Sequence, residues 1–210
     1  MTPYVKNIVD KIAADMAHDD ILQYFGEKCY MAKTTFSEIV EYFIEDANFE
    51  ILYSIFKSEH FKKNAEILDS YNEPVIHSMM YAIYAITTMQ NGTLSETQRL
   101  AMKDEFIKLI TDESLPFVWN ITDANIDNPM HLVLTHWECY TKEEILKILA
   151  LAYDHGVNPL NRNDMDCNAI DTLLSFDEMP EDFKNEILAL IMPMCDKNII
   201  EIEKNAYATA

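Results

Sequence analysis

Glycine is scarce in this chain of 210 residues, which contains only Gly26, Gly92 and Gly156. Loops that bind phosphate through backbone N–H groups need several glycines close together, so the sequence excludes every glycine-rich nucleotide-binding loop. The same scarcity argues against a β protein with many tight turns. Two of the glycines stand where helices are expected to end, in Asn91-Gly92 and His155-Gly156, because glycine accepts the left-handed backbone of a helix terminus.

Long apolar runs and paired cysteines are also missing. Cys29, Cys139, Cys167 and Cys195 are far apart and form no Cys-x-x-Cys motif, which argues against a zinc ribbon and against a disulfide framework. No apolar run approaches the roughly 18 residues of a membrane-spanning helix, and the N-terminus lacks the charged start and apolar core of a signal peptide. We therefore expect a cytoplasmic protein with reduced thiols.

Positive charge is the third deficit. The chain has 36 Asp and Glu residues against 16 Lys and Arg, and the excess is largest after residue 120, where 17 acids face six bases. Such a field repels nucleic-acid phosphates and anionic membranes and attracts basic partners. We expect no direct binding of nucleic acid or membrane, and either a partner with a basic surface or an acidic surface that only keeps the protein in solution.

Helical periodicity is what the sequence does contain. Apolar residues recur every three or four positions through most of the chain, and strand-like alternation is absent. Three segments match a capping box, in which Ser or Thr and a Glu or Gln three residues later satisfy N–H groups at a helix start. They are Thr35–Glu38, Ser95–Gln98 and Thr141–Glu144. The pattern predicts an all-α fold.

The segment from Asp123 to His131 carries a more specific signal. Asn128 is suited to cap a helix, Pro129 to occupy its first position, and Met130 to face the core. The segment resembles the ankyrin signature, in which an Asp opens a turn and Thr-Pro-Leu-His begins the inner helix. The resemblance implies an inner helix to about residue 137 and an outer helix over residues 141–153.

Other segments extend the resemblance. His155-Gly156 and the residues to Pro159 are similar to the turn that follows an outer ankyrin helix, and residues 163–174 repeat the register of residues 123–134. Earlier, Asp69 and His77 have the same spacing as Asp123 and His131. Helix starts are thus expected at residues 34, 74, 128 and 168, and the likeness is closest over residues 117–175.

The resemblance implies a helical repeat solenoid with three or four irregular ankyrin-like repeats over residues 34–210. Residues 1–33, with Ile8, Val9, Ile12 and Met16 on one face, would form an N-terminal helical cap. The turn glycine of the family is replaced in the three units by Asn72, Ile126 and Asp166. Because Ile adopts the left-handed backbone poorly, a helical repeat of another kind is the competing fold.

The resemblance also implies roles for single residues. His77 and His131 would tie a turn to its neighbour by hydrogen bonds, and Asn128, Pro129 and Gly156 would shape helix ends. A partner-binding surface would be formed by turn tips and inner-helix faces, from Trp119, Asn120, Asn125, Thr135, His136, Trp137, Arg162, Asp164, Met165 and Asp166. Trp137 and Arg162 are the preferred anchors, although Trp137 fits a core position equally well.

Metal sites and catalysis find little support in the sequence. His131 and His136 are five residues apart and would lie on different faces of a helix, so they do not form a zinc site with Cys139. The cluster Asn161, Asn163, Asp164 and Asp166 lacks the central Gly and the final Glu of a calcium loop. We therefore predict no metal, no cofactor and no catalytic residues.

These observations favour a protein–protein interaction module. Irregular acidic ankyrin-like proteins resemble bacterial effectors and viral or phage proteins that act on a host. Two alternatives of other classes stay open. One is an acidic mimic of nucleic acid that blocks a DNA- or RNA-binding protein, and the other is an enzyme whose site has no recognisable motif.

Overall fold

The computed structural model describes residues 3–15, 20–21, 23–24, 33–63, 74–88 and 94–208. All regular elements in these ranges are helices, so the prediction of an all-α fold is confirmed. The chain forms two compact units, Met1–Val118 and Trp119–Ala210, here called unit 1 and unit 2. Within the described ranges no helix is both long enough and apolar enough to cross a membrane.

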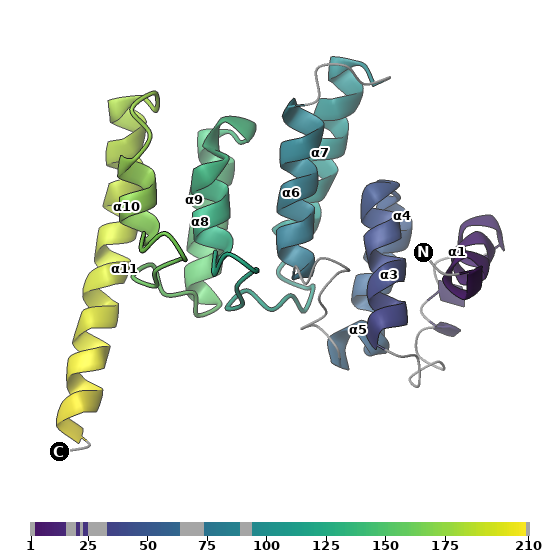
Figure 1. Ribbon diagram of the computed structural model, residues 1–210, viewed down its shortest axis with the longest axis horizontal. Coiled ribbons are helices and arrows are strands. Elements are labelled where there is room, and N and C mark those ends of the chain that lie inside the picture. Colours follow the sequence, from purple (N-terminus) through teal and green to yellow (C-terminus); the bar gives the residue numbers. More distant parts are fainter. Residues whose placement is uncertain are drawn as a thin grey trace. The chain divides into compact units, whose positions relative to one another are not determined.

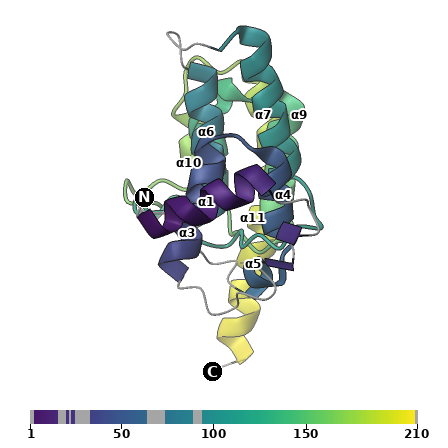
Figure 2. The same cartoon turned by 90° about the vertical axis from the view of Figure 1, so that its right-hand side faces the viewer.

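Unit 1 contains six described helices. They are α1 (Pro3–Asp15), α3 (Lys33–Glu45), α4 (Phe49–Lys57), α5 (Glu59–Lys63), α6 (Val75–Thr88) and α7 (Glu96–Ile110). Helix α1 packs against α3, α3 packs against α4 and α6, and α6 lies beside α7 (Figure 1, Figure 2). The face of α1 predicted to be buried is buried at Ile8, Val9 and Ile12, while Met16 lies outside the described residues.

Phenylalanine rings form the centre of unit 1. Phe56 lies 4.8 Å from Phe61 and 5.0 Å from Phe117, measured between ring centroids, and Phe36, Phe43 and Phe106 are also fully buried. Rings of this size bury a large apolar area, and the tilted and edge-to-face contacts between them add to that burial. The rings come from α3, α4, α5, α7 and the segment that follows α7, so they connect helices that are distant in the sequence.

The two predicted capping boxes in unit 1 have different outcomes. At α7 the box is confirmed, because the Ser95 hydroxyl accepts a hydrogen bond from the Gln98 N–H and the Gln98 side chain accepts one from the Ser95 N–H. The box predicted at Thr35–Glu38 is wrong. The helical backbone of α3 already includes Lys33, so Thr35 lies inside the helix and not at its non-helical cap position. Asp69, Asn72 and Asn91-Gly92 lie outside the described residues.

Unit 2 consists of two helix pairs. Its elements are α8 (Pro129–Thr135), a short 3-10 helix (Trp137–Cys139), α9 (Lys142–Asp154), α10 (Ala169–Leu174) and α11 (Glu181–Ala208). Helix α8 packs against α9 and α10, and α11 packs against α9 and α10 (Figure 1). The core between these helices is aliphatic and includes Met130, Val133, Leu134, Ile145, Ile148, Leu149, Leu173, Ile187 and Ile191.

The helix ends of unit 2 follow the chemistry read from the sequence. Thr141 and Glu144 form the predicted capping box at the start of α9. Helix α9 ends where Gly156 adopts a φ of +88°, and the Gly156 N–H donates to the Tyr153 carbonyl over 2.9 Å. Helix α8 is two residues shorter than expected, because the chain tightens into the 3-10 turn that contains Trp137.

Candidate interaction surface

Two loops of unit 2, residues 123–128 (loop A) and 163–168 (loop B), are closed by the same backbone hydrogen bonds. In loop A the Asp123 N–H donates to the Asp127 carbonyl over 3.0 Å, and the Ile126 N–H donates to the Asp123 carbonyl over 3.1 Å. In loop B, Asn163 and Cys167 form the first of these bonds over 3.0 Å, and Asp166 and Asn163 form the second over 3.1 Å. The two backbones therefore follow the same path, 40 residues apart.

The first side chain of each loop makes the same contacts. The Asp123 Oδ1 atom accepts hydrogen bonds from the N–H groups of Asn125 and Asp127, at 2.9 and 2.8 Å. The Asn163 Oδ1 atom accepts from the N–H groups of Met165 and Cys167, at 3.1 and 3.0 Å. Asp and Asn are suited to this position because their short side chains reach backbone groups two to four residues ahead. Asn163 was not among the predicted structural residues, although its distance of 40 residues from Asp123 was a signal for it.

The fourth residue of each loop has a left-handed backbone. Ile126 has a φ of +61° and Asp166 a φ of +60°. The turn geometry that the Ile substitution put in question is therefore adopted at both positions. Asp tolerates this conformation, whereas a β-branched residue such as Ile is disfavoured there.

Each loop ends in a helix cap. The Asn128 Oδ1 atom accepts from the N–H groups of Met130 and His131, at 2.9 and 3.2 Å, and Pro129 is the first residue of α8. Asn168 caps α10 in the same way. The predicted roles of Asn128 as a cap and of Pro129 at the first helical position are confirmed.

Two hydrogen bonds join the loops directly. The Asp164 N–H donates to the Asn125 carbonyl over 3.0 Å, and the Asn163 side-chain amide donates to the Asp127 carboxylate over 2.8 Å. Burial raises the pKa of Asp127, and the hydrogen bond from Asn163 partly opposes this effect. The loops are thus a single hydrogen-bonded body and not two independent tips.

His131 is fully buried behind these loops. Its Nδ1 atom accepts a hydrogen bond from the Asn128 N–H over 3.1 Å, so the proton of the neutral ring is assigned to Nε2. Burial lowers the pKa of His131, against the opposing influence of Asp127 and of the backbone of Cys167 and Asn161. The Nε2 atom is buried without a hydrogen-bond partner among the described residues, so the hydrogen bonds of the ring hold loop A alone. The tie from His131 to a neighbouring turn stays a prediction. In unit 1, His77 is also fully buried and is also the third residue of its helix, α6.

The loop surface consists of exposed side chains of the two loops, Asn125, Ile126, Asp164, Met165 and Asp166, together with Arg162, which directly precedes loop B. Met165 is 71% exposed and Ile126 is 52% exposed, which is unusual for large apolar side chains. The Arg162 guanidinium donates to the Asp166 carbonyl and lies 3.3 Å from the Asp171 carboxylate, so its orientation is fixed against loop B and the start of α10. Ile126 was not predicted as a binding residue, although its place at a turn tip pointed to exposure.

Trp119 does not belong to this surface. It is only 3% exposed, and its ring stacks on His155 with centroids 5.8 Å apart and planes 15° from parallel. The prediction that it contacts a partner is wrong, because the apolar ring is a core residue of unit 2. The neighbouring Asn120 is exposed, as predicted for a surface position.

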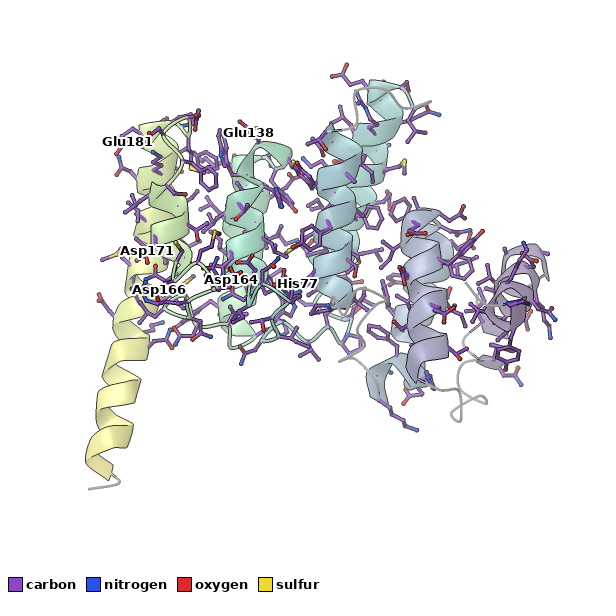
Figure 3. The ribbon with its side chains drawn as sticks, in the orientation of Figure 1. His77, Glu138, Asp164, Asp166, Asp171 and Glu181 are labelled. Atoms are coloured by element: carbon purple, nitrogen blue, oxygen red, sulfur yellow. The ribbon has the colours of Figure 1, made fainter. Side chains whose placement is uncertain are left out.

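Thr135, His136 and Trp137 lie at the C-terminal end of α8, whereas the loop surface adjoins its N-terminal end. Figure 3 shows Glu138, next to Trp137, at one end of the helix pairs and Asp164 and Asp166 at the other. The two groups were predicted to form one surface, and the structure does not bring them together. Thr135 is exposed, burial lowers the pKa of the half-buried His136, and Trp137 is half-buried with its ring 6.3 Å from that of Phe183.

Among the described residues, no three His, Cys, Asp or Glu side chains are close enough together to hold a metal ion. Comparison of the chain with protein-family models, with curated proteins and with solved structures gave no match. The likeness to ankyrin repeats therefore rests on the residues and hydrogen bonds of this chain alone.

Proposed function

We propose that this protein is an ankyrin-like helical repeat scaffold that binds a partner protein through the loop surface. The observation that carries the proposal is the pair of loops with the same hydrogen bonds, joined to each other, which expose Ile126 and Met165 beside Asp164 and Asp166. The hydrogen bonds already fix the backbone of both loops, so binding orders side chains but not the loops themselves, and more of the contact energy contributes to affinity.

The charge of the loop surface indicates the chemistry of the partner. Asp164 and Asp166 are exposed, whereas the charge of Arg162 is engaged by Asp166 and Asp171. The surface therefore presents excess negative charge around two apolar contacts. A partner with an apolar patch bordered by Lys or Arg would match it in both respects.

The test begins with affinity capture by the full chain and identification of the captured protein by mass spectrometry. Binding rates are then measured for Ile126→Ser/Met165→Ser, for Asp164→Lys/Asp166→Lys and for Trp137→Ala. We expect the first variant to dissociate faster, because it loses apolar contacts, and the second to associate more slowly, because exposed charges act on steering. Trp137→Ala is the control at the opposite end of α8 and should bind like the wild type.

Other outcomes would contradict the proposal. A large loss in Trp137→Ala, with none in the loop variants, would place the binding surface at the far end of the helix pairs. Association that depends strongly on salt but is unchanged by Ile126→Ser/Met165→Ser would favour a mimic of nucleic acid, whose binding depends on charge alone.

A further inference from the structure

Unit 1 contains a groove of about 420 Å3 between α4 and α7. It is lined by Phe49, Glu50 and Tyr53 of α4 and by Glu105, Lys108 and Leu109 of α7. Its volume falls in the range of about 300 to 1,000 Å3 that is usual for ligand sites in proteins.

The floor of the groove is apolar and firmly held. Phe49 and Tyr53 stand four residues apart on the same face of α4, and both are half-buried. The Phe49 ring meets the fully buried ring of Phe106 edge-on, with centroids 4.8 Å apart. Phe49 is thus supported by the core beneath it, while the outer parts of both aromatic side chains remain accessible.

The charges at the rim are unbalanced. Lys108 and Glu105 form an ion pair with each other, so their charges cancel. The Glu50 carboxylate is exposed and forms no ion pair with any residue that the structure describes. The Lys57 ammonium group already lies 4.4 Å from the centroid of the Tyr53 ring, and its charge interacts with that of Asp112. Among the residues that the structure describes, the groove therefore offers an apolar floor and one carboxylate without an ion pair.

We propose that this α4–α7 groove docks a basic, amphipathic peptide segment of another protein. An apolar side chain of that segment lies against Phe49, Tyr53 and Leu109, and a neighbouring Lys or Arg pairs with Glu50. This proposal does not depend on the loop surface in unit 2, so either proposal can be wrong while the other is correct.

The form and charge of the groove favour such a segment over other occupants. Small-molecule sites enclose most of their ligand, whereas here Glu50 and Lys108 are exposed and Phe49 and Tyr53 are half-exposed. An open groove of this kind suits one side chain that projects from a larger partner. A second copy of the chain is disfavoured, because each copy carries a net charge of −20.

A random twelve-residue peptide library displayed on phage would test the proposal, with the folded full chain as the bait. We expect the enriched peptides to carry an aliphatic or aromatic residue next to Lys or Arg. A synthetic peptide of the enriched sequence should bind Glu50→Lys and Tyr53→Ser about tenfold more weakly than the wild type, because each change removes one of the two recognition elements. Circular dichroism of each variant checks that the fold is retained.

Glu96→Lys is the matched control, because Glu96 is also exposed and also lies in the first turn of its helix, α7. It should bind the peptide like the wild type, as should the loop variant Ile126→Ser/Met165→Ser. The proposal is overturned if no sequence is enriched, if the enriched peptides lack a cation, or if Glu96→Lys weakens binding as much as Glu50→Lys does. The last result would mean that the peptide responds to the overall charge alone.

Discussion

Unit 1 is packed around phenylalanine rings, and unit 2 is held at its loops by the side chains of Asn, Asp and His. Eight of the ten phenylalanines lie in unit 1, whereas the repeated loops with their Asn caps lie in unit 2. Ring packing has no fixed sequence spacing, because any ring can meet any other. Hydrogen bonds from Asp and Asn act over two to four residues and leave a local pattern. The loops and caps of unit 2 can therefore be predicted from its sequence more directly than the ring packing of unit 1.

The largest expected effect is in the ring core of unit 1. Phe56→Ala should lower the free energy of unfolding by about 3 to 5 kcal/mol, because it removes a fully buried ring and leaves a cavity next to Phe61 and Phe117. Urea denaturation followed by circular dichroism measures the loss. Phe183→Ala, at a half-buried position of unit 2, is the control and should cost less. Equal losses of unfolding free energy in the two variants would show that unit 1 does not depend more strongly on its phenylalanine rings than unit 2 does.

A smaller effect is expected at the loops of unit 2. His131→Ala should lower the free energy of unfolding by about 1 to 3 kcal/mol, because the Asn128 N–H is left buried without its acceptor. In Asp171→Ala the Asn168 N–H loses its acceptor in the same way, but at a half-exposed position. The free energy of unfolding should therefore fall by less than in His131→Ala. Thermal unfolding measures both. An unchanged melting temperature in His131→Ala would contradict the role assigned to this ring.

The stability of unit 2 should also depend on pH through His131. Burial holds its folded-state pKa below the ordinary value of 6.5, even though Asp127 and Asp123 oppose the shift. As the pH falls below 6.5, the unfolded chain binds a proton more readily than the folded chain, so the free energy of unfolding decreases. The slope for one proton is at most about 1.4 kcal/mol per pH unit. The raised pKa of Asp127 acts in the opposite direction, nearer the ordinary carboxyl value of 3.8.

Urea midpoints at about pH 7 and about pH 5.5 measure this dependence. His131→Asn serves as the comparison, because Asn at this position does not titrate in this range while the other five histidines are unchanged. It should lose less stability than the wild type between the two pH values. A wild type and a variant with the same pH dependence would show that His131 does not contribute.

The smallest expected effect has the opposite sign. Ile126→Asn should raise the free energy of unfolding by about 1 kcal/mol or less, because Asn tolerates the φ of +61° that is costly for Ile, and the exposed Ile side chain loses little packing. The reciprocal change, Asp166→Ile, should lower it by a similar amount. Differential scanning calorimetry of the two variants checks the pair. A loss of stability in Ile126→Asn would show that its side chain contributes packing within unit 2.

The sequence was most informative where the chemistry is local. The caps at Asn128 and Thr141 and the helix end at Gly156 were all read from residues within four positions of the group that they satisfy. The start of α10 after Asn168 followed from the 40-residue spacing. These features depend on backbone groups that are close together in the chain, so they can be predicted from the sequence without any knowledge of the tertiary structure.

The failures concern contacts between distant residues. Nothing near Trp119 indicates that His155 covers its ring, and nothing near Trp137 indicates that Phe183 lies beside it. The binding residues were grouped by analogy with a concave repeat surface, whereas the short helix α8 separates Trp137 from Arg162. The groove of unit 1 was not predicted either, because its lining comes from two helices about 50 residues apart in the sequence.

The 40-residue spacing of loops A and B limits how the gene can lengthen unit 2. An added segment fits the fold when it is one complete repeat of that length. A tandem duplication whose ends fall at equivalent points of the two loops adds one complete helix pair. Its junction joins two halves of the same backbone path, with an Asp or Asn at the first position and an Asn cap at the last. A duplication of another length breaks that path and separates a cap from its helix. The hydrogen bonds that close each loop thus also set the unit in which this part of the chain can lengthen.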